Sequence, residues 1–348
     1  MTKGYIFHRT IFVLSLLTMV PMSGYTISAG VTQGRLYFAD DRHCVFAGRE
    51  AAFPLIYDPG DTSRSPRQVQ AYLQVNRRTV ARGRAEFKRG QNGKSKAELK
   101  LTPPSVKEDV VLSATLEIVI SPDADADDGN IRRTRNIHLF HPDPFSARQT
   151  WLEECNIRLF DPIGKTAECL EDSNIPHELI LNKARIRGFT DGILLIGAGI
   201  SLSKQRGLLQ NALTAAEGGA SVLFLGVKEG QTALPGISST RSVQPERVVL
   251  RGDEVVKSFD KRFDVLSNPS VAESKNRPLK FKAERDHILG SFSQDEEEKT
   301  KSWDWFLAEY ESGGRFAVSG MPLIGMWSSS PIPRYLLLEI LKSWDAGK

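Results

Sequence analysis

Gly192-Ile193-Leu194-Leu195-Ile196-Gly197-Ala198-Gly199 (GILLIGAG, residues 192–199) is the most informative stretch of the chain. A short apolar run between glycines is typical of a strand that is buried on both faces of a sheet. Residues 204–217 follow with leucine and alanine on one helical face, and SVLFL at 221–225 predicts a second buried strand. A strand, a helix and a strand in this order predict a parallel sheet that is covered by helices on both faces.

The same alternation of apolar strands and amphipathic helices extends from this unit in both directions. Further strands are expected at 157–160, 175–180, 247–250, 279–283, 287–292 and 315–319. Further helices are expected at 165–172 and 335–344, because their apolar residues recur at helical spacing. Residues 147–348 are therefore predicted to form an α/β domain.

Residues 30–146 have a different pattern, with short alternating apolar runs between turn signals. Ala71-Tyr72-Leu73-Gln74-Val75 is one such run, and Asp58-Pro59-Gly60-Asp61 is one such turn. Repeated short strands without a helical pattern predict an all-β sandwich, of an immunoglobulin-like or fibronectin-like kind. The segment HPDPFSAR at 141–148 is the predicted boundary, since prolines cannot continue a strand ladder.

The first 29 residues predict a cleavable signal peptide. Lys3 and Arg9 precede the apolar run IFVLSLLTMV at 11–20, and Pro21 and small residues follow it. Retention as a membrane anchor is the alternative, although a spanning helix needs about 20 apolar residues. We expect an exported protein, periplasmic or extracellular, with membrane contact only if this segment is retained.

Composition fits a two-domain globular protein of 348 residues. The formal net charge of +4 is too small to indicate a nucleic-acid partner. Basic residues nevertheless gather at two places, which are Arg77, Arg78, Arg82, Arg84, Lys88, Arg89, Lys94, Lys96 and Lys100, and then Arg132, Arg133 and Arg135. A solvated strand face is the simpler interpretation, and an anion-binding face for acidic polysaccharide or a membrane surface is the alternative.

The three cysteines, Cys44, Cys155 and Cys169, are too few for a fold that depends on disulfides. Cys155 would precede a strand that rises about 16 Å, and Cys169 would lie on a helix that returns about 8 Å. Because this places them at different heights, we expect no disulfide bond. None of the three has the spacing of a metal-ligand set.

Two glycine-containing turns could be mistaken for nucleotide sites. Gly164-Lys165-Thr166 matches the end of a P-loop, but Leu159 stands where that motif needs a glycine. Gly197-Ala198-Gly199 lacks the third glycine of a dinucleotide site, because Leu202 holds that position. Tight turns are the simpler interpretation of both, and no cofactor is expected.

Two side-chain clusters also have plain interpretations. His138 and His141 have no third ligand nearby, so no metal site is expected. The aromatic residues between 303 and 310 have a helical spacing, which favours a helix seated against a core. An exposed aromatic strip that holds sugar rings is the alternative.

Four groups of residues carry a family resemblance. They are LFDP at 159–162 with GKT at 164–166, DGILLIG at 191–197, GG at 218–219 with VLFL at 222–225, and GGR at 313–315 leading to MPL at 321–323. Together they resemble the class I glutamine amidotransferase-like fold. They are most similar to the non-catalytic versions found with bacterial carbohydrate-active enzymes, such as the trimerisation domain of β-galactosidases. The resemblance implies a flavodoxin-like α/β domain.

The catalytic members of that family carry a nucleophilic cysteine in a Gly-x-Cys-x-Gly elbow after a strand. Residues 226–230 (GVKEG) supply the glycines here, but Lys228 holds the position of the nucleophile. The family's activating His-x-Glu pair does not follow, because His287 is the only histidine after His177. The resemblance therefore implies a domain that does not hydrolyse glutamine.

In such a sheet the default ligand site is the mouth at the carboxyl ends of the strands at 157–160, 192–196 and 221–225. Its predicted lining is Asp161, Gly197, Ser201, Lys228 and Glu229. No residue is assigned a catalytic or metal-binding role.

Three functions remain open. The leading hypothesis is an exported, non-catalytic binding or assembly protein with a carbohydrate or protein partner. The second is an exported hydrolase of carbohydrate or cell-wall polymer, which would need two carboxylates roughly 5–10 Å apart. Asp161 and Glu229 are the only such pair that can be placed at one mouth. The third is an interaction module that joins an envelope complex through its sandwich.

Overall fold

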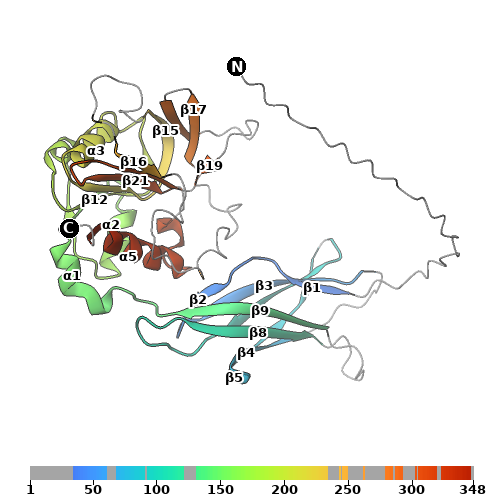
Figure 1. The fold of residues 1–348 in the computed structure, drawn as a ribbon. Coiled ribbons are helices and arrows are strands. Elements are labelled where there is room, and N and C mark those ends of the chain that lie inside the picture. Colours follow the sequence, from blue (N-terminus) through green and yellow to red (C-terminus); the bar gives the residue numbers. More distant parts are fainter. Residues whose placement is uncertain are drawn as a thin grey trace, which may run out of the picture.

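The computed structural model describes residues 34–60, 68–90, 92–120, 131–233, 243, 245–249, 262, 279–284, 287–292, 302–303, 305–319 and 323–345. The predicted signal peptide at 1–29 lies outside these residues. Figure 1 shows two β-rich bodies, one of blue to green strands and one of green to red elements, and α1 (Gln149–Glu154) lies in the connection between them. The expectation of a β-rich chain with more than one unit is confirmed at this coarse level.

The N-terminal unit consists of two sheets. The first has the order β1-β3-β7-β6, with β1 at Arg35–Phe38, β3 at Ala51–Asp58, β7 at Ser95–Leu101 and β6 at Lys88–Arg89. The second has the order β2-β9-β8-β4-β5, with β2 at Cys44–Phe46, β9 at Ile131–Phe140, β8 at Leu112–Ile120, β4 at Gln68–Val75 and β5 at Arg78–Glu86. Neighbouring strands are antiparallel except β2 and β9, which are parallel.

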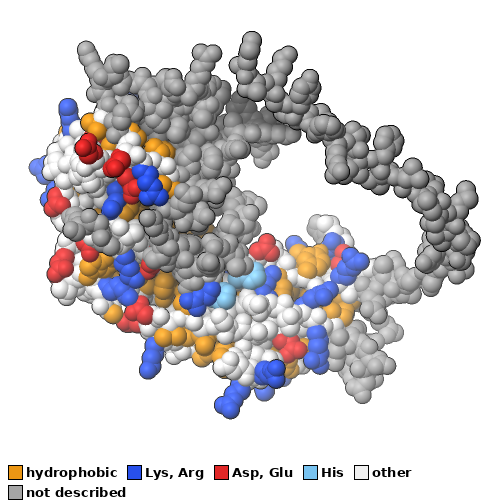
Figure 2. All heavy atoms as spheres, in the orientation of Figure 1, with side chains coloured by type: hydrophobic (Ala, Val, Ile, Leu, Met, Phe, Trp, Pro, Cys, Tyr) orange, Lys and Arg blue, Asp and Glu red, His pale blue; other side chains and the backbone are white. Residues whose placement is uncertain are grey.

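Alternating burial explains why these strands pack as a sandwich. Every second residue of β3 and β7 is buried, and Phe53 and Leu99 lie directly opposite each other. They share one core with Leu116 of β8 in the second sheet. Burial of one such side chain contributes about 1.5–3 kcal/mol. The outward residues of β7 are charged, and Figure 2 shows Lys and Arg side chains over the outside of this unit.

The C-terminal unit contains a larger sheet with the order β11-β10-β12-β14-β21-β20-β16. Its strands are β11 (Glu178–Leu179), β10 (Ile157–Phe160), β12 (Ile193–Ile196), β14 (Ser221–Phe224), β21 (Arg315–Ser319), β20 (Trp305–Glu309) and β16 (Arg247–Val249). The run from β11 to β21 is parallel, and β20 pairs antiparallel with both β21 and β16. The expected strand at 175–180 is limited to β11.

Helices cover both faces of this sheet, which explains the uninterrupted apolar run of β12. Ile193 and Leu195 face a core that includes residues of α1, α2 (Lys165–Glu171) and α5 (Ile332–Asp345). Leu194 and Ile196 face the opposite core, with α3 (Leu208–Glu217) and the 3-10 helix η2 (Lys183–Gly188). Within the described residues, no helix combines the length and the apolarity that are needed to cross a bilayer.

A third sheet has the order β13-β15-β18-β17-β19. Its strands are β13 (Ile200–Ser201), β15 (Val227–Ala233), β18 (His287–Phe292), β17 (Leu279–Glu284) and β19 (Ser302–Trp303). The helix expected for the aromatic residues between 303 and 310 is not formed, because β19 and β20 occupy this stretch. Trp305, Phe306 and Tyr310 are buried, so they form no exposed strip for sugar rings.

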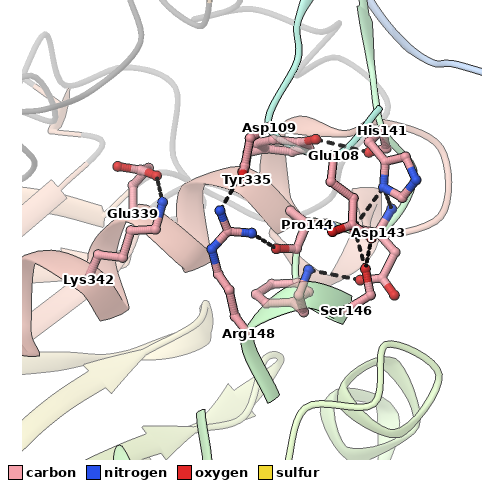
Figure 3. Close-up of polar contacts among 11 residues, drawn as sticks. Glu108, Asp109, His141, Asp143, Pro144, Ser146, Arg148, Tyr335, Glu339 and Lys342 are labelled. Carbon is pink, nitrogen blue, oxygen red and sulfur yellow. Dashed lines mark hydrogen bonds and ion pairs between the residues drawn. The ribbon is translucent and has the colours of Figure 1, made fainter. Parts of the chain in front are cut away.

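The two units meet through a short 3-10 helix and through α5. Figure 3 shows the 3-10 helix η1 (Ser146–Arg148), which spans the predicted boundary between 146 and 147. The Ser146 hydroxyl donates to Glu108 at 2.8 Å, and Arg148 forms an ion pair with Asp109 and donates to the Pro144 carbonyl at 2.8 Å. These contacts fix the chain where it leaves the sandwich.

Helix α5 then packs against the end of the sandwich. The Tyr335 hydroxyl donates to the His141 carbonyl at 3.2 Å, and its ring lies edge-on to Phe140 with centroids 5.0 Å apart. Arg334 is only 6% exposed, and its guanidinium donates to the carbonyls of Pro142 at 2.8 Å and Trp327 at 3.0 Å. The two units are therefore joined by packed and hydrogen-bonded side chains as well as by the covalent chain.

Candidate functional site

Parallel pairing brings the ends of β10, β12 and β14 to one edge of the large sheet. Phe160 pairs with Ile196, and Ile196 pairs with Phe224. The residues that directly follow these strands therefore lie near one another. Asp161 follows β10 and Gly197 follows β12.

Asp161 is the central polar side chain of this edge. Its carboxylate accepts hydrogen bonds from the backbone N–H groups of Ile163 at 3.2 Å, Thr166 at 2.7 Å and Ala167 at 3.0 Å. The first amides of a helix have no partner within the helix, and a carboxylate also suits the positive end of the helix dipole. Asp161 therefore caps α2, with Gly164 at a positive φ of 85° in the turn before it.

Position 197 requires glycine, because the backbone there lies too close to the Asp161 carboxylate for a side chain. A Cβ atom at position 197 would lie 2.7 Å from Asp161 Oδ1, which no real side chain tolerates. The next residue is fixed as well, since the Ala198 N–H donates to the buried Thr166 hydroxyl at 2.9 Å. The loop after β12 and the start of α2 are thus joined through one carboxylate and one hydroxyl.

Ser201, Lys228 and Glu229 lie beyond this edge, on the third sheet. Ser201 on β13 pairs with Glu229 on β15, and the Ser201 and Ser203 hydroxyl oxygens are 2.8 Å apart. Lys228 and Glu229 are consecutive residues of β15. The structure therefore brings Asp161 and Gly197 into contact, and it pairs Ser201 with Glu229 in a neighbouring sheet.

The predicted nucleophile elbow at 226–230 is not formed. An elbow turns from a strand into a helix, so that its central side chain is exposed at the turn. Here Gly226, at a φ of 144°, leads from β14 directly into the strand β15. Lys228 consequently lies within a strand and not at the tip of a turn.

No cysteine near this edge has the properties of an activated nucleophile. Cys169 lies on α2, where burial and the nearby Asp172 raise the pKa of its thiol. Reactive cysteines have a lowered pKa, because the thiolate is the nucleophile. All three cysteines lie among the described residues, and none is in a disulfide bond. The described residues also contain no group of three or more His, Cys, Asp or Glu that could hold a metal ion.

The second basic cluster consists of Arg132, Arg133 and Arg135, and its side chains bond to other groups of the sandwich. Arg132 pairs with Glu117 at 3.2 Å, Arg133 donates to the Leu36 carbonyl at 3.1 Å, and the nearly buried Arg135 pairs with Asp40 at 3.1 Å. Burial lowers the pKa of Arg135, and its guanidinium stacks on Phe38 at 3.7 Å. This second cluster therefore bonds to other groups of the sandwich.

Sequence reasoning missed Thr166 and Arg334 as organising residues. Thr166 stands in the segment that was compared with a P-loop, but Asp161-Pro162 followed by Gly164 also fits a turn and cap before a helix. Arg334 gave no local signal, because its acceptor Pro142 lies in the other unit, 192 positions away in sequence.

No family model matches the chain, and no curated protein matches it. Among solved structures, domain 1 of VCBP3 from Branchiostoma floridae aligns at 12% identity over 31% of this chain and 95% of that chain, with a TM-score of 0.20. A family 123 glycoside hydrolase from Clostridium perfringens aligns at 8% identity over 52% and 33%, with a TM-score of 0.18. Plasmodium falciparum protein Pf12p aligns at 10% identity over 80% and 90%, with a TM-score of 0.15. TM-scores this low carry no argument for fold or function.

Proposed function

We propose that this chain is an exported, non-catalytic binding or assembly protein. Its C-terminal unit would be an inactive amidotransferase-like domain, and its N-terminal unit an immunoglobulin-like or fibronectin-like sandwich. The observation that carries the proposal is the Asp161 carboxylate, which is occupied by three backbone N–H groups of its own chain. Asp161 is the residue that the hydrolase hypothesis needs at this edge.

Strand order supports the fold part of the proposal. In chain order, the parallel strands β11-β10-β12-β14-β21 run second, first, third, fourth and fifth. Flavodoxin-like doubly wound sheets have this order, and their ligands bind outside the carboxyl ends of the strands, at the switch between the first and third strands. Here that switch lies between β10 and β12, beside Asp161 and Gly197.

Three features argue against catalysis at this edge. Asp161 is used as a helix cap, the elbow of catalytic amidotransferases is replaced by β15, and the raised pKa of Cys169 keeps its thiol protonated. A helix N-terminus that is already capped by a carboxylate also repels an anionic substrate. The edge is therefore suited to a structural or binding role.

Fixed geometry between the two units supports an assembly role. Arg334 and Tyr335 of α5 bond to Pro142 and His141 at the end of the sandwich. A partner that binds one unit would therefore find the other unit at a fixed position next to it. The proposed partner is a carbohydrate or a protein, and Lys228 and Glu229 of β15 are the charged residues that we propose to contact it.

The mouth is tested by titrating the mature chain, residues 30–348, with a panel of neutral and acidic polysaccharides and peptidoglycan fragments. A Lys228→Ala/Glu229→Ala variant should bind at least tenfold more weakly than the wild type. The matched control is Arg187→Ala/Glu171→Ala, which removes one basic and one acidic exposed residue elsewhere on the same unit. Unchanged binding by the first variant would show that the mouth is not the ligand site.

A further inference from the structure

The first basic cluster lies along one side edge of the sandwich. Strand β5 is the last strand of its sheet, β6 is the last strand of the other, and β6 pairs with β7. The two sheets approach each other here, since a Cβ atom at Gly83 of β5 would lie 2.7 Å from the Lys100 carbonyl of β7. Charges on β5, β6 and β7 therefore belong to one continuous surface, which we call the basic edge.

Five exposed residues define the basic edge, namely Arg82, Arg84, Lys88, Arg89 and Lys96. In the part of the chain that the structure describes, no ion pair involves any of them. Their neighbours are different, because Lys94 pairs with Asp58 at 3.1 Å and Lys100 pairs with Glu50 at 3.1 Å. Figure 2 shows Lys and Arg side chains protruding where Figure 1 labels β4 and β5.

One pair in this group opposes the stability of the sheet. Lys88 of β6 and Lys96 of β7 are direct cross-strand partners. Like charges directly opposite each other destabilise a sheet, and departures from such local rules concentrate at functional sites. A bound anion would relieve this repulsion.

These charges lie on the outer faces of both sheets, and this placement suits a flexible linear ligand better than a flat one. Arg82 and Arg84 lie opposite Tyr72 and Gln70 on the outer face of the second sheet, while Lys96 lies on the outer face of the first. A planar membrane can touch only one of these opposite faces, and duplex DNA is too stiff to bend around the edge of a sandwich about 10 Å thick. A flexible linear polyanion can follow the charges from β5 across β6 to β7.

We propose that the basic edge binds an acidic polysaccharide, with carboxylate or sulfate groups paired to these lysine and arginine side chains. This is a second site, separate from the mouth of the large sheet, and it does not depend on binding there. It supplies a partner of defined chemistry for a protein that is itself a binding or assembly protein.

The test is a titration of the mature chain at 50 and 200 mM salt with heparin and polygalacturonate as probes. Neutral dextran, phosphatidylserine vesicles and single-stranded and duplex DNA are run in parallel. The variant carries Arg82→Gln, Arg84→Gln, Lys88→Gln and Lys96→Gln. The control carries Arg185→Gln, Arg187→Gln, Lys204→Gln and Arg206→Gln, which removes the same charge from exposed positions of the other unit.

We expect the wild type to bind an acidic polysaccharide and to bind less tightly at the higher salt, because charged contacts release counterions. The basic-edge variant should lose roughly tenfold or more in affinity, with a weaker salt dependence, while the control keeps its affinity. The probe should also raise the melting temperature of the wild type more than that of the variant.

Three results would overturn the proposal. The first is no polysaccharide binding at 50 mM salt, and the second is an equal loss of affinity in the control, which would assign binding to net charge. The third is tighter binding to vesicles or DNA than to both acidic polysaccharides. Because the basic-edge variant changes only the sandwich, its results leave the test with Lys228→Ala/Glu229→Ala unaffected.

Discussion

The backbone N–H of Thr166 donates a 2.7 Å hydrogen bond to the carboxylate of Asp161. The hydroxyl of the same threonine accepts a 2.9 Å hydrogen bond from the N–H of Ala198. Two polar side chains thereby join the end of β10, the start of α2 and the loop after β12. The polar groups at this edge hold the backbone together, and this structural role is why we propose that the edge is not catalytic.

Removal of the Asp161 cap should lower the stability of the whole C-terminal unit. Asp161→Ala leaves the N–H groups of Thr166 and Ala167 without their acceptor, and loss of such a cap costs about 1–2 kcal/mol. Asp161→Asn keeps a capping oxygen and should cost about half as much or less. Urea denaturation measures both, and equal stability of Asp161→Ala and wild type would contradict the capping role.

Loss of the Arg334 side chain should weaken the junction between the two units. Arg334 bonds two carbonyls and its guanidinium lies over the rings of Phe46 at 5.2 Å and Trp327 at 5.5 Å. Arg334→Ala should cost about 2–4 kcal/mol, because it removes packing and leaves buried acceptors unpaired.

The matched control for Arg334 is Arg132→Ala, since the Arg132 side chain is 65% exposed in its ion pair with Glu117. An exposed pair of this kind contributes only about 0–1 kcal/mol. Arg334→Ala should therefore be the more destabilising by denaturant midpoint. If the two variants have the same midpoint, the packed junction does not contribute as described.

Glu217 should make stability depend on pH. Burial raises the pKa of this carboxyl above its ordinary value of 4.5, and its Oε1 atom is buried without a hydrogen-bond partner among the described residues. The folded state therefore holds the proton of Glu217 more tightly than the unfolded state does. This proton binding stabilises the fold fully below the ordinary pKa, and the stabilisation is lost as the pH rises through the raised pKa.

This direction of the pH dependence can be tested with Glu217→Gln. Glu217→Gln removes the buried charge, so it should raise the melting temperature at pH 7, by the equivalent of about 1 kcal/mol. At pH 3.5 the variant and the wild type should melt together, because both side chains are then neutral. A stabilisation that is equal at the two pH values would show that charge burial is not its cause.

Export should leave a shortened N-terminus. We expect cleavage between Gly24 and Gly30, so intact-mass measurement of the protein from the exported fraction should give a chain that begins in that interval. Replacement of Leu16 and Leu17 by Arg should interrupt the apolar run and keep the full-length protein inside the cell. A full-length chain in the membrane fraction would instead support retention as an anchor.

Local sequence predicted the elements whose burial is uniform. The strand expected at 192–196 is β12 at Ile193–Ile196, and the helix expected at 204–217 is α3, which begins later at Leu208. The run at 221–225 likewise appears as β14. In each case the apolar pattern lies entirely within the segment, so its secondary structure can be predicted without knowledge of its distant contacts.

Segments that depend on distant partners were predicted less well. Trp305–Glu309 was expected to be helical, but it pairs with both β21 and β16 and is buried on both faces. Two-sided burial removes the alternation that marks a strand, so the aromatic spacing could equally fit a helix. The segment after Gly226 became a strand because it pairs with β18, some 60 residues later, and this cannot be inferred from the glycines of residues 226–230.

Of the five residues predicted to line the mouth, Asp161 and Gly197 follow neighbouring strands of the large sheet, whereas Ser201, Lys228 and Glu229 lie on the third sheet. Asp161 and Gly197 lie at one edge, as expected from parallel strands. That Asp161 caps α2 depends on the positions of backbone N–H groups, which the sequence does not contain. Lys228 was placed at an elbow, whereas it lies within β15.

The central claim is tested most directly by reducing-end release from acidic and neutral polysaccharides and peptidoglycan, measured for the wild type and for Asp161→Asn. Asp161→Asn removes the acid and keeps one oxygen that can accept from the N–H groups of α2, so a catalytic carboxylate and a structural one behave differently in it. We predict no substrate-dependent release by either protein, with similar melting temperatures. Release by the wild type that is abolished in a folded Asp161→Asn variant would contradict the non-catalytic role.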